Sequence, residues 1–190
     1  MFGRLLLIVA VCVGFALGRA DSSQGEALSP LEYERQVKVA FIYNFSRFVE
    51  WPDDTFANGT SSFTVCVLGN NPLSGALDTI KGKAVKDKKI AIKRLTNASN
   101  MDGCQVLFIS SEEKEHLTQI LESARKLRVL TIGEMSQFNR AGGIVALAMR
   151  KNRIRFSVNL EAAEETGMKI SSRVLSLATV VNYDHQGDGR

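Results

Sequence analysis

Few side chains in this chain could build a nucleophile, a metal site or a proton relay: three cysteines and two histidines. His116 follows an acidic run on the predicted exposed face of a helix and His185 lies near the C-terminus, so we expect both to be solvated. No Cys-x-x-Cys motif or zinc-ligand spacing is present, and Gly69 and Gly75 do not complete a dinucleotide-binding motif. No histidine is placed near a strand end for a serine hydrolase. We therefore predict no catalytic residue, no metal and no cofactor, and hence a protein that is not an enzyme.

The first twenty residues have the pattern of a secretory signal peptide. Arg4 gives the positive start, Leu5–Leu17 is apolar but too short to span a bilayer, and Gly18 and Ala20 are the small residues before a cleavage point. We predict cleavage after Ala20 and a periplasmic mature protein; an uncleaved anchor is the alternative.

The charge of the chain gives little support to a nucleic-acid partner. Removing residues 1–20 takes away two arginines and no acidic residue, so the formal net charge falls from +4 to +2. This small excess is spread along the chain, whereas nucleic-acid binding depends on many concentrated phosphate contacts. We predict no nucleic-acid partner.

Cys66 and Cys104 are the cysteines of the predicted mature protein. Cys66 lies inside the predicted strand 64–68, and Cys104 directly precedes the run Gln105–Ile109, which contains the predicted strand 106–109. Export permits a disulfide, which requires the two Cα atoms to lie within about 7 Å of each other. Two buried free thiols are the alternative.

A long helix is predicted directly after a polar, flexible segment 21–28. Ser29–Glu32 is a capping box with proline at the first helical position, and Trp51-Pro52 ends the helix. Asn44 lies within the predicted buried stripe, so we expect its amide to be buried and hydrogen-bonded to a loop backbone; a ligand contact is the alternative. The stripe recurs at helical spacing and comprises Val37, Ala40, Phe41, Asn44, Phe45 and Phe48.

Strands and helices alternate through the remainder of the chain. The predicted strands are 64–68, 89–95, 106–109, 128–133, 144–149 and 154–158. The predicted helices are 72–80, 110–124, 159–166 and 174–178. This order predicts one α/β domain over residues 29–182, with a doubly wound, mostly parallel sheet and helices on both faces. The last two strands are joined by a short polar turn, so we expect a hairpin that adds an antiparallel edge strand. Residues 183–190 form a polar tail.

Loops at the carboxyl ends of parallel strands form the usual ligand crevice of such a fold. Free backbone N–H groups there would favour an anion or a small polar ligand. The alternative is that these residues only form turns and helix caps. The candidate ligand-binding residues are Gly69, Asn70, Asn71, Ser110, Ser111 and Gly133.

Several blocks of the sequence, taken together and in order, resemble the YfiR family of bacterial periplasmic regulators. The resemblance covers about residues 33–181 and rests on Lys38–Pro52, Val65–Gly69, Cys104–Ser110, Phe156–Ala163 and Gly167–Ala178. It implies a non-enzymatic and often dimeric protein that binds the periplasmic sensor part of an inner-membrane diguanylate cyclase. Such a protein would control cyclic di-GMP and biofilm formation. An outer-membrane lipoprotein can sequester proteins of this kind.

The same resemblance bears on individual residues. Cys66 and Cys104 match a cysteine pair of the family, which favours the disulfide. A second pair in the last third of the best-known member is absent here, so a redox-switching second disulfide is not implied. Exposed candidates for partner binding are Glu164, Glu165 and Arg173. Some relatives accompany sensor kinases, so a small-molecule-binding sensor module is the alternative function.

Overall fold

The computed structural model describes residues 28–56, 61–70, 73–151 and 153–181. The predicted signal peptide, residues 21–27 of the predicted segment 21–28, the predicted tail 183–190 and the candidate residue Asn71 lie outside the described residues.

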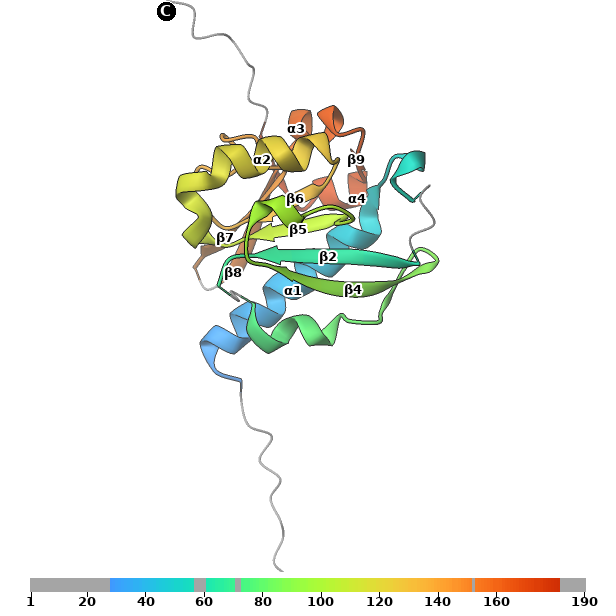
Figure 1. Cartoon of the computed structure of the whole chain (residues 1–190). Coiled ribbons are helices and arrows are strands. Elements are labelled where there is room, and N and C mark those ends of the chain that lie inside the picture. The colour runs from blue at the N-terminus through green and yellow to red at the C-terminus, as the bar shows by residue number, and fades with distance from the viewer. Residues whose placement is uncertain (1–27, 57–60, 71–72, 152, 182–190) are drawn as a thin grey trace, which may run out of the picture.

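An eight-stranded, mostly parallel sheet forms the centre of the domain (Figure 1). The predicted α/β class with helices on both faces is confirmed. The pairs β3–β4 and β7–β8 are antiparallel, and all other neighbours are parallel. In spatial order the strands are β10 (Thr179–Val181), β8 (Arg153–Asn159), β7 (Val145–Arg150), β6 (Leu130–Gly133), β5 (Val106–Ile109), β2 (Ser62–Leu68), β4 (Lys88–Leu95) and β3 (Ala84–Val85).

Two α-helices and a 3-10 helix begin at a capping side chain that the sequence supplies. Ser29 and Ser110 accept hydrogen bonds from the N–H groups of Glu32 and Glu112, and Asn159 accepts one from Ala162. The α-helices are α1 (Pro30–Phe48), α2 (Leu117–Lys126), α3 (Leu160–Glu165) and α4 (Ser172–Leu175). Short 3-10 helices span Asp53–Phe56, Ser74–Thr79, Ala98–Asn100 and Ser111–His116.

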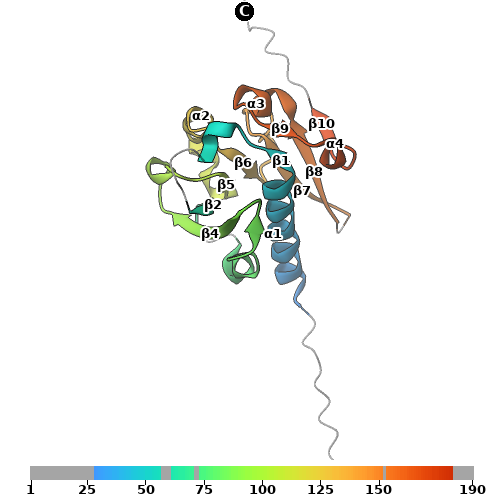
Figure 2. The same ribbon diagram turned by 90° about the vertical axis from the view of Figure 1, so that its right-hand side faces the viewer.

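Two separate cores lie on the two faces of the sheet. Side chains alternate along a strand, so β2 directs Val65 and Val67 toward the core that contains α1 and Cys66 and Leu68 toward the core that contains α2. Figure 2 shows α1 running along the curled sheet and α2 on its other side. The continuous apolar runs of the central strands follow from burial on both faces.

The predicted disulfide between Cys66 and Cys104 is confirmed. Both residues are buried, and their Cα atoms are 5.7 Å apart. Because β2 and β5 are neighbours in the sheet, the residue that precedes β5 is brought beside the middle of β2.

Two small pairings were not predicted from the sequence. Strand β10 pairs with the second half of β8, so the predicted antiparallel strand has a short parallel neighbour on its outer side. Strand β1 (Val49–Glu50) pairs with β9 (Lys169–Ile170) and ties the end of α1 to the segment between α3 and α4. Strands of two or three residues carry too little periodicity to be recognised before their partners are known.

The prediction of which face of α1 is buried was partly wrong. The fully buried positions are Val39, Ile42, Phe45 and Ser46. Asn44 is exposed, which corrects the expectation of a buried amide, and Phe41 and Phe48 are only partly buried. The helix carries apolar residues on more than one side, and the side that packs against the sheet is rotated about the helix axis from the predicted stripe.

Candidate functional site: an aromatic groove and two polar hollows

The predicted ligand crevice at the carboxyl ends of the strands is closely packed around Gly69. Gly69 has a φ of +105°, and a Cβ at that position would overlap the side chain of Ser110. The N–H of Asn70 donates to the Glu112 carboxylate at 3.2 Å, so one of the predicted donors is engaged by the chain itself. Ser110 is buried and caps the following 3-10 helix.

Gly133 ends the neighbouring strand β6, opposite Ile109, and packs against an aromatic ring. A Cβ on Gly133 or on Gly143 would overlap Phe138, so both glycines make room for this fully buried ring between β6 and β7. The structure therefore brings Gly69 and Ser110 together but gives Gly133 a packing role. That these residues bind a ligand stays a prediction.

Ser111, by contrast, lines an open cavity of about 240 Å³. Lys38 of α1 lies in this cavity and forms ion pairs with Glu34, at 2.7 Å, and with Glu134, which follows β6. The cavity is lined by Glu34, Lys38, Ser111, Glu134, Leu147, Ala148, Met149 and Ile154. Burial alone would lower the pKa of Lys38. Hydrogen bonds and charge from the two carboxylates raise that pKa by more, so it stands above its ordinary value of 10.5.

This raised pKa gives a testable pH dependence. The ion pairs of Lys38 stabilise the fold while the amine is charged, so their contribution is complete below the unfolded-state pKa and is lost as the pH rises through the folded-state pKa. We expect Lys38→Met to lower the free energy of unfolding by on the order of 1 kcal/mol at neutral pH and to reduce its decline in alkali. Urea unfolding measured from about pH 9 to about pH 12 checks this. Lys81→Met, at an exposed lysine, should decline in alkali as the wild type does.

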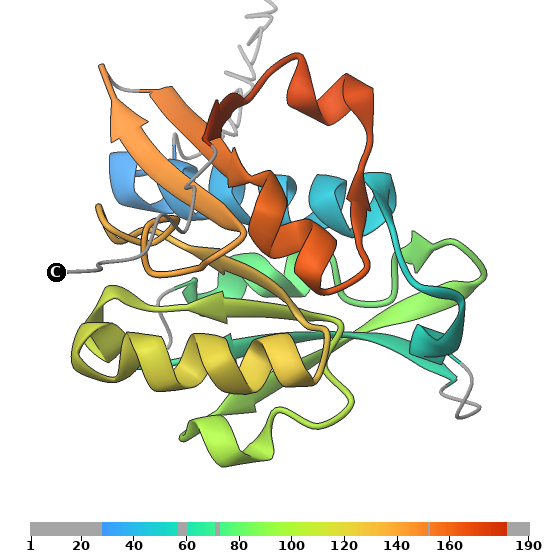
Figure 3. The ribbon, with the colours of Figure 1, turned by 90° about the horizontal axis from the view of Figure 1, so that it is seen from above.

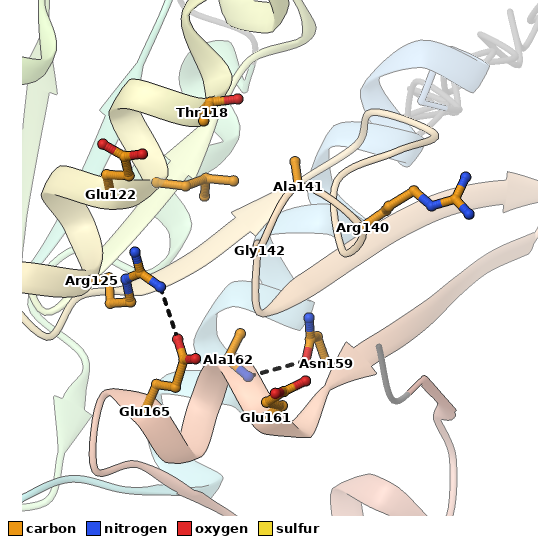
Figure 4. Close-up of a pocket in the computed structure, with 11 residues that line it drawn as sticks. Thr118, Glu122, Arg125, Arg140, Ala141, Gly142, Asn159, Glu161, Ala162 and Glu165 are labelled. Carbon is orange, nitrogen blue, oxygen red and sulfur yellow. Dashed lines mark hydrogen bonds and ion pairs between the residues drawn. The ribbon is translucent and has the colours of Figure 1, made fainter. Parts of the chain in front are cut away.

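A second polar hollow, of about 170 Å³, lies between α2 and α3 (Figure 4). Arg125 of α2 and Glu165 of α3 form an ion pair across it at 3.1 Å, whereas Arg140 points away from that pair. Both paired side chains are substantially exposed, so this contact adds little stability. Glu165 is one of the predicted partner-binding residues; Glu164 is exposed on the same short helix.

Beneath this hollow the buried polar groups are satisfied by the protein. The Asn159 amide donates to the Asn139 carbonyl and accepts from the N–H of Ala162, both at 3.0 Å. The Asn139 amide donates to the carbonyls of Gly143 and Ile144. These bonds fix the start of α3 against the turn before β7.

An aromatic groove runs between α1 and α4. The Phe156 ring lies 5.3 Å from the rings of both Phe41 and Phe45, and the Arg173 guanidinium lies 6.0 Å from the centre of the Phe48 ring. Leu177 is 73% exposed at the rim of the groove. The groove encloses about 170 Å³ and is lined by Phe41, Asn44, Phe45, Phe48, Phe156, Arg173, Val174 and Leu177.

The structure separates the predicted partner-binding residues into two places. Arg173 belongs to the aromatic groove, whereas Glu164 and Glu165 are on α3. Sequence reasoning missed the groove because its phenylalanines were assigned to the core. One signal was available in the sequence: the predicted helix has apolar residues at Val39 and Ile42 in addition to the predicted stripe. This is more apolar surface than a single contact face requires.

The described residues contain no cluster of three or more histidine, cysteine or acidic side chains that could hold a metal ion. His116 is exposed, and His185 lies outside the described part of the chain. No helix within the described ranges is long and apolar enough to cross a membrane.

Two solved structures illustrate the similarity of the fold. A conserved domain protein of Vibrio cholerae O1 biovar El Tor is similar with a TM-score of 0.54, 14% identity and 82% of this chain covered. The ABC domain of Streptococcus pneumoniae, solved in complex with L-Trp, has a TM-score of 0.53, 11% identity and 77% coverage. This chain spans 61% and 60% of those two chains. At such identity these likenesses concern the fold alone.

The family assignment comes from the sequence of the whole domain. The YfiR/HmsC-like family matches residues 35–179, from the first turns of α1 into β10. This match includes the disulfide, the aromatic groove and both polar hollows, and it supports a regulatory role in the periplasm. The chain belongs to the YfiR/HmsC-like family.

Proposed function

We propose that this protein is a non-enzymatic periplasmic regulator that binds the periplasmic sensor part of a membrane-bound diguanylate cyclase and restrains it. Cyclic di-GMP and biofilm formation would then fall while the protein is bound. Membership of the YfiR/HmsC-like family supports the regulatory class. An outer-membrane lipoprotein that sequesters the protein, and a homodimer, are further parts of this proposal.

The aromatic groove is the observation that carries the proposal. Phe41, Phe48 and Leu177 form an apolar surface that the fold itself does not cover, and surfaces of this kind mark interaction sites. Arg47 and Arg173 both lie over the Phe48 ring and add positive charge beside the groove. Aromatic and arginine side chains are the types that contribute most to protein interfaces. We place the docking surface here, with Glu164 and Glu165 of α3 as further candidates.

Deleting the gene tests the proposed output. We expect cellular cyclic di-GMP to rise in the deletion strain and to return to the wild-type level on complementation with the exported protein. The nucleotide is measured by mass spectrometry of cell extracts. An unchanged level in the deletion strain would argue against a cyclase target.

A small-molecule sensor acting with a sensor kinase is the second candidate, and the cavity around Lys38 favours it. That cavity places a charged amine, two carboxylates and the Ser111 side chain next to apolar residues of β7 and β8. A zwitterionic metabolite with an amine for the carboxylates fits this chemistry. A thermal-shift screen with amino acids and nucleotides separates the two candidates, because a ligand of the native state raises the melting temperature by mass action.

A further inference from the structure

We propose that the tip of the β7–β8 hairpin binds the anionic surface of a phospholipid membrane. We call this tip the basic hairpin and define it by Arg150, Lys151, Arg153 and Arg155. The biological meaning of this inference rests on the proposed function, because lipid binding would hold the regulator beside the membrane that contains its partner. The binding itself is a separate property of the purified protein.

The basic hairpin places its cations together. Arg150 and Arg153 are directly opposite each other in the ladder, and Arg155 is opposite Ala148. Residues two apart along a strand share a face, so the three arginines lie on one face of the hairpin. With Lys151 they border an open hollow of about 540 Å³.

These charges are not balanced within the described part of the chain. All four side chains are exposed, and none forms an ion pair with a described carboxylate, whereas Lys38, Arg125 and Arg128 each do. Like charges directly opposite each other on a sheet destabilise the pairing. The arrangement therefore costs the fold some stability, and an external anion would offset that cost.

The shape of the basic hairpin favours a membrane over an acidic protein. Figure 3 shows the two strands projecting from the body of the sheet. Small residues, Ala146, Ala148 and Ser157, lie on the face that carries the arginines, so this face offers no aromatic anchor or apolar pocket of the kind that dominates protein interfaces. Met149, on the opposite face of the hairpin, is 45% exposed near the tip. Cations beside an anionic membrane each strengthen binding about fivefold.

Protection of a sheet edge is the competing explanation. Strand β10 covers only Ser157–Asn159, so charges on the first half of β8 would discourage pairing with another chain. That explanation accounts for Arg153 and Arg155 but not for Arg150 and Lys151, and it requires no affinity for lipid.

Vesicle co-sedimentation of the mature chain tests the inference. We expect binding to phosphatidylcholine vesicles that contain about one-third phosphatidylglycerol, and none to phosphatidylcholine alone, at about 0.1 M salt. Arg150→Gln/Arg153→Gln should bind about 30-fold more weakly, from about fivefold for each cation. Lys81→Gln/Lys89→Gln removes the same charge from exposed lysines near the opposite edge of the sheet and should bind as the wild type does.

Three other outcomes would overturn the inference. Equal weakening by both double variants would show that vesicle binding depends only on the net charge of the protein. Equal binding to both vesicle types would show that it does not need anionic lipid. If the hairpin variant binds vesicles normally but loses affinity for the periplasmic part of the cyclase, the hairpin docks on a protein.

The inference and the proposed function can fail separately. The expected vesicle binding of the purified proteins, together with unchanged cyclic di-GMP in the deletion strain, would refute the proposed function and leave this inference intact. The folded hairpin variant should be as stable as the wild type or slightly more stable, because the substitution removes a repulsive pair.

Discussion

Leu177→Asp should weaken binding to the periplasmic sensor part of the proposed partner cyclase by about 100-fold, which corresponds to about 3 kcal/mol. Leu177 is 73% exposed at the rim of the aromatic groove, so the fold does not depend on its side chain. In the complex, however, the new carboxylate would be taken out of water against the apolar groups of the groove, which is costly even beside Arg173. Calorimetric titration of the two purified proteins measures the dissociation constant.

Leu31→Asp is the matched control for this variant. Leu31 is 56% exposed in the first turn of α1, where a carboxylate suits the helix dipole, and it lies about 15 Å along the helix from Phe41. Affinity should be unchanged. Equal losses for the two variants would show an unspecific effect of charge, and an unchanged affinity of Leu177→Asp would move docking away from the groove. A change in oligomeric state without a change in partner affinity would make the groove an interface between two copies of this chain.

Cys66→Ala/Cys104→Ala should lower the free energy of unfolding by about 4 kcal/mol, a large share of the stability of a domain of this size. The disulfide closes a loop with a sequence separation of 38, so its loss returns considerable entropy to the unfolded chain. Both positions are buried in the core beside α2, where truncation adds a smaller packing cost. Urea unfolding curves give the difference.

Reductant supplies the internal control for the disulfide. Dithiothreitol should shift the wild-type unfolding midpoint toward that of the double variant and should leave the double variant where it is. A wild-type curve that does not respond to reductant, under conditions in which free thiols are detected in the unfolded protein, would contradict the stabilising role assigned to this bond.

Local sequence signals were sufficient for much of the fold. The caps at Ser29, Ser110 and Asn159 start the helices where expected, because a side-chain acceptor for the first N–H groups is a property of a few adjacent residues. The buried run at β5 was equally clear, since burial on both faces leaves no polar position in the strand.

Non-local contacts were beyond the sequence patterns. Lys38 and Glu134 are 96 residues apart, and the two residues that pair β1 with β9 have no periodicity of their own. Phe138 explains Gly133 and Gly143 only once β6 and β7 are seen to be neighbours. In each case the signal is the relation between two distant segments.

By itself the sequence determined the α/β order of elements, the cysteine pair and the lack of a recognisable catalytic motif, because each depends on residue type and short spacing. The tertiary structure alone decided which apolar residues of α1 are buried and which line the aromatic groove. A helix with apolar residues on two sides can pack through either, and its contacts with the sheet, Phe156 and α4 make that choice.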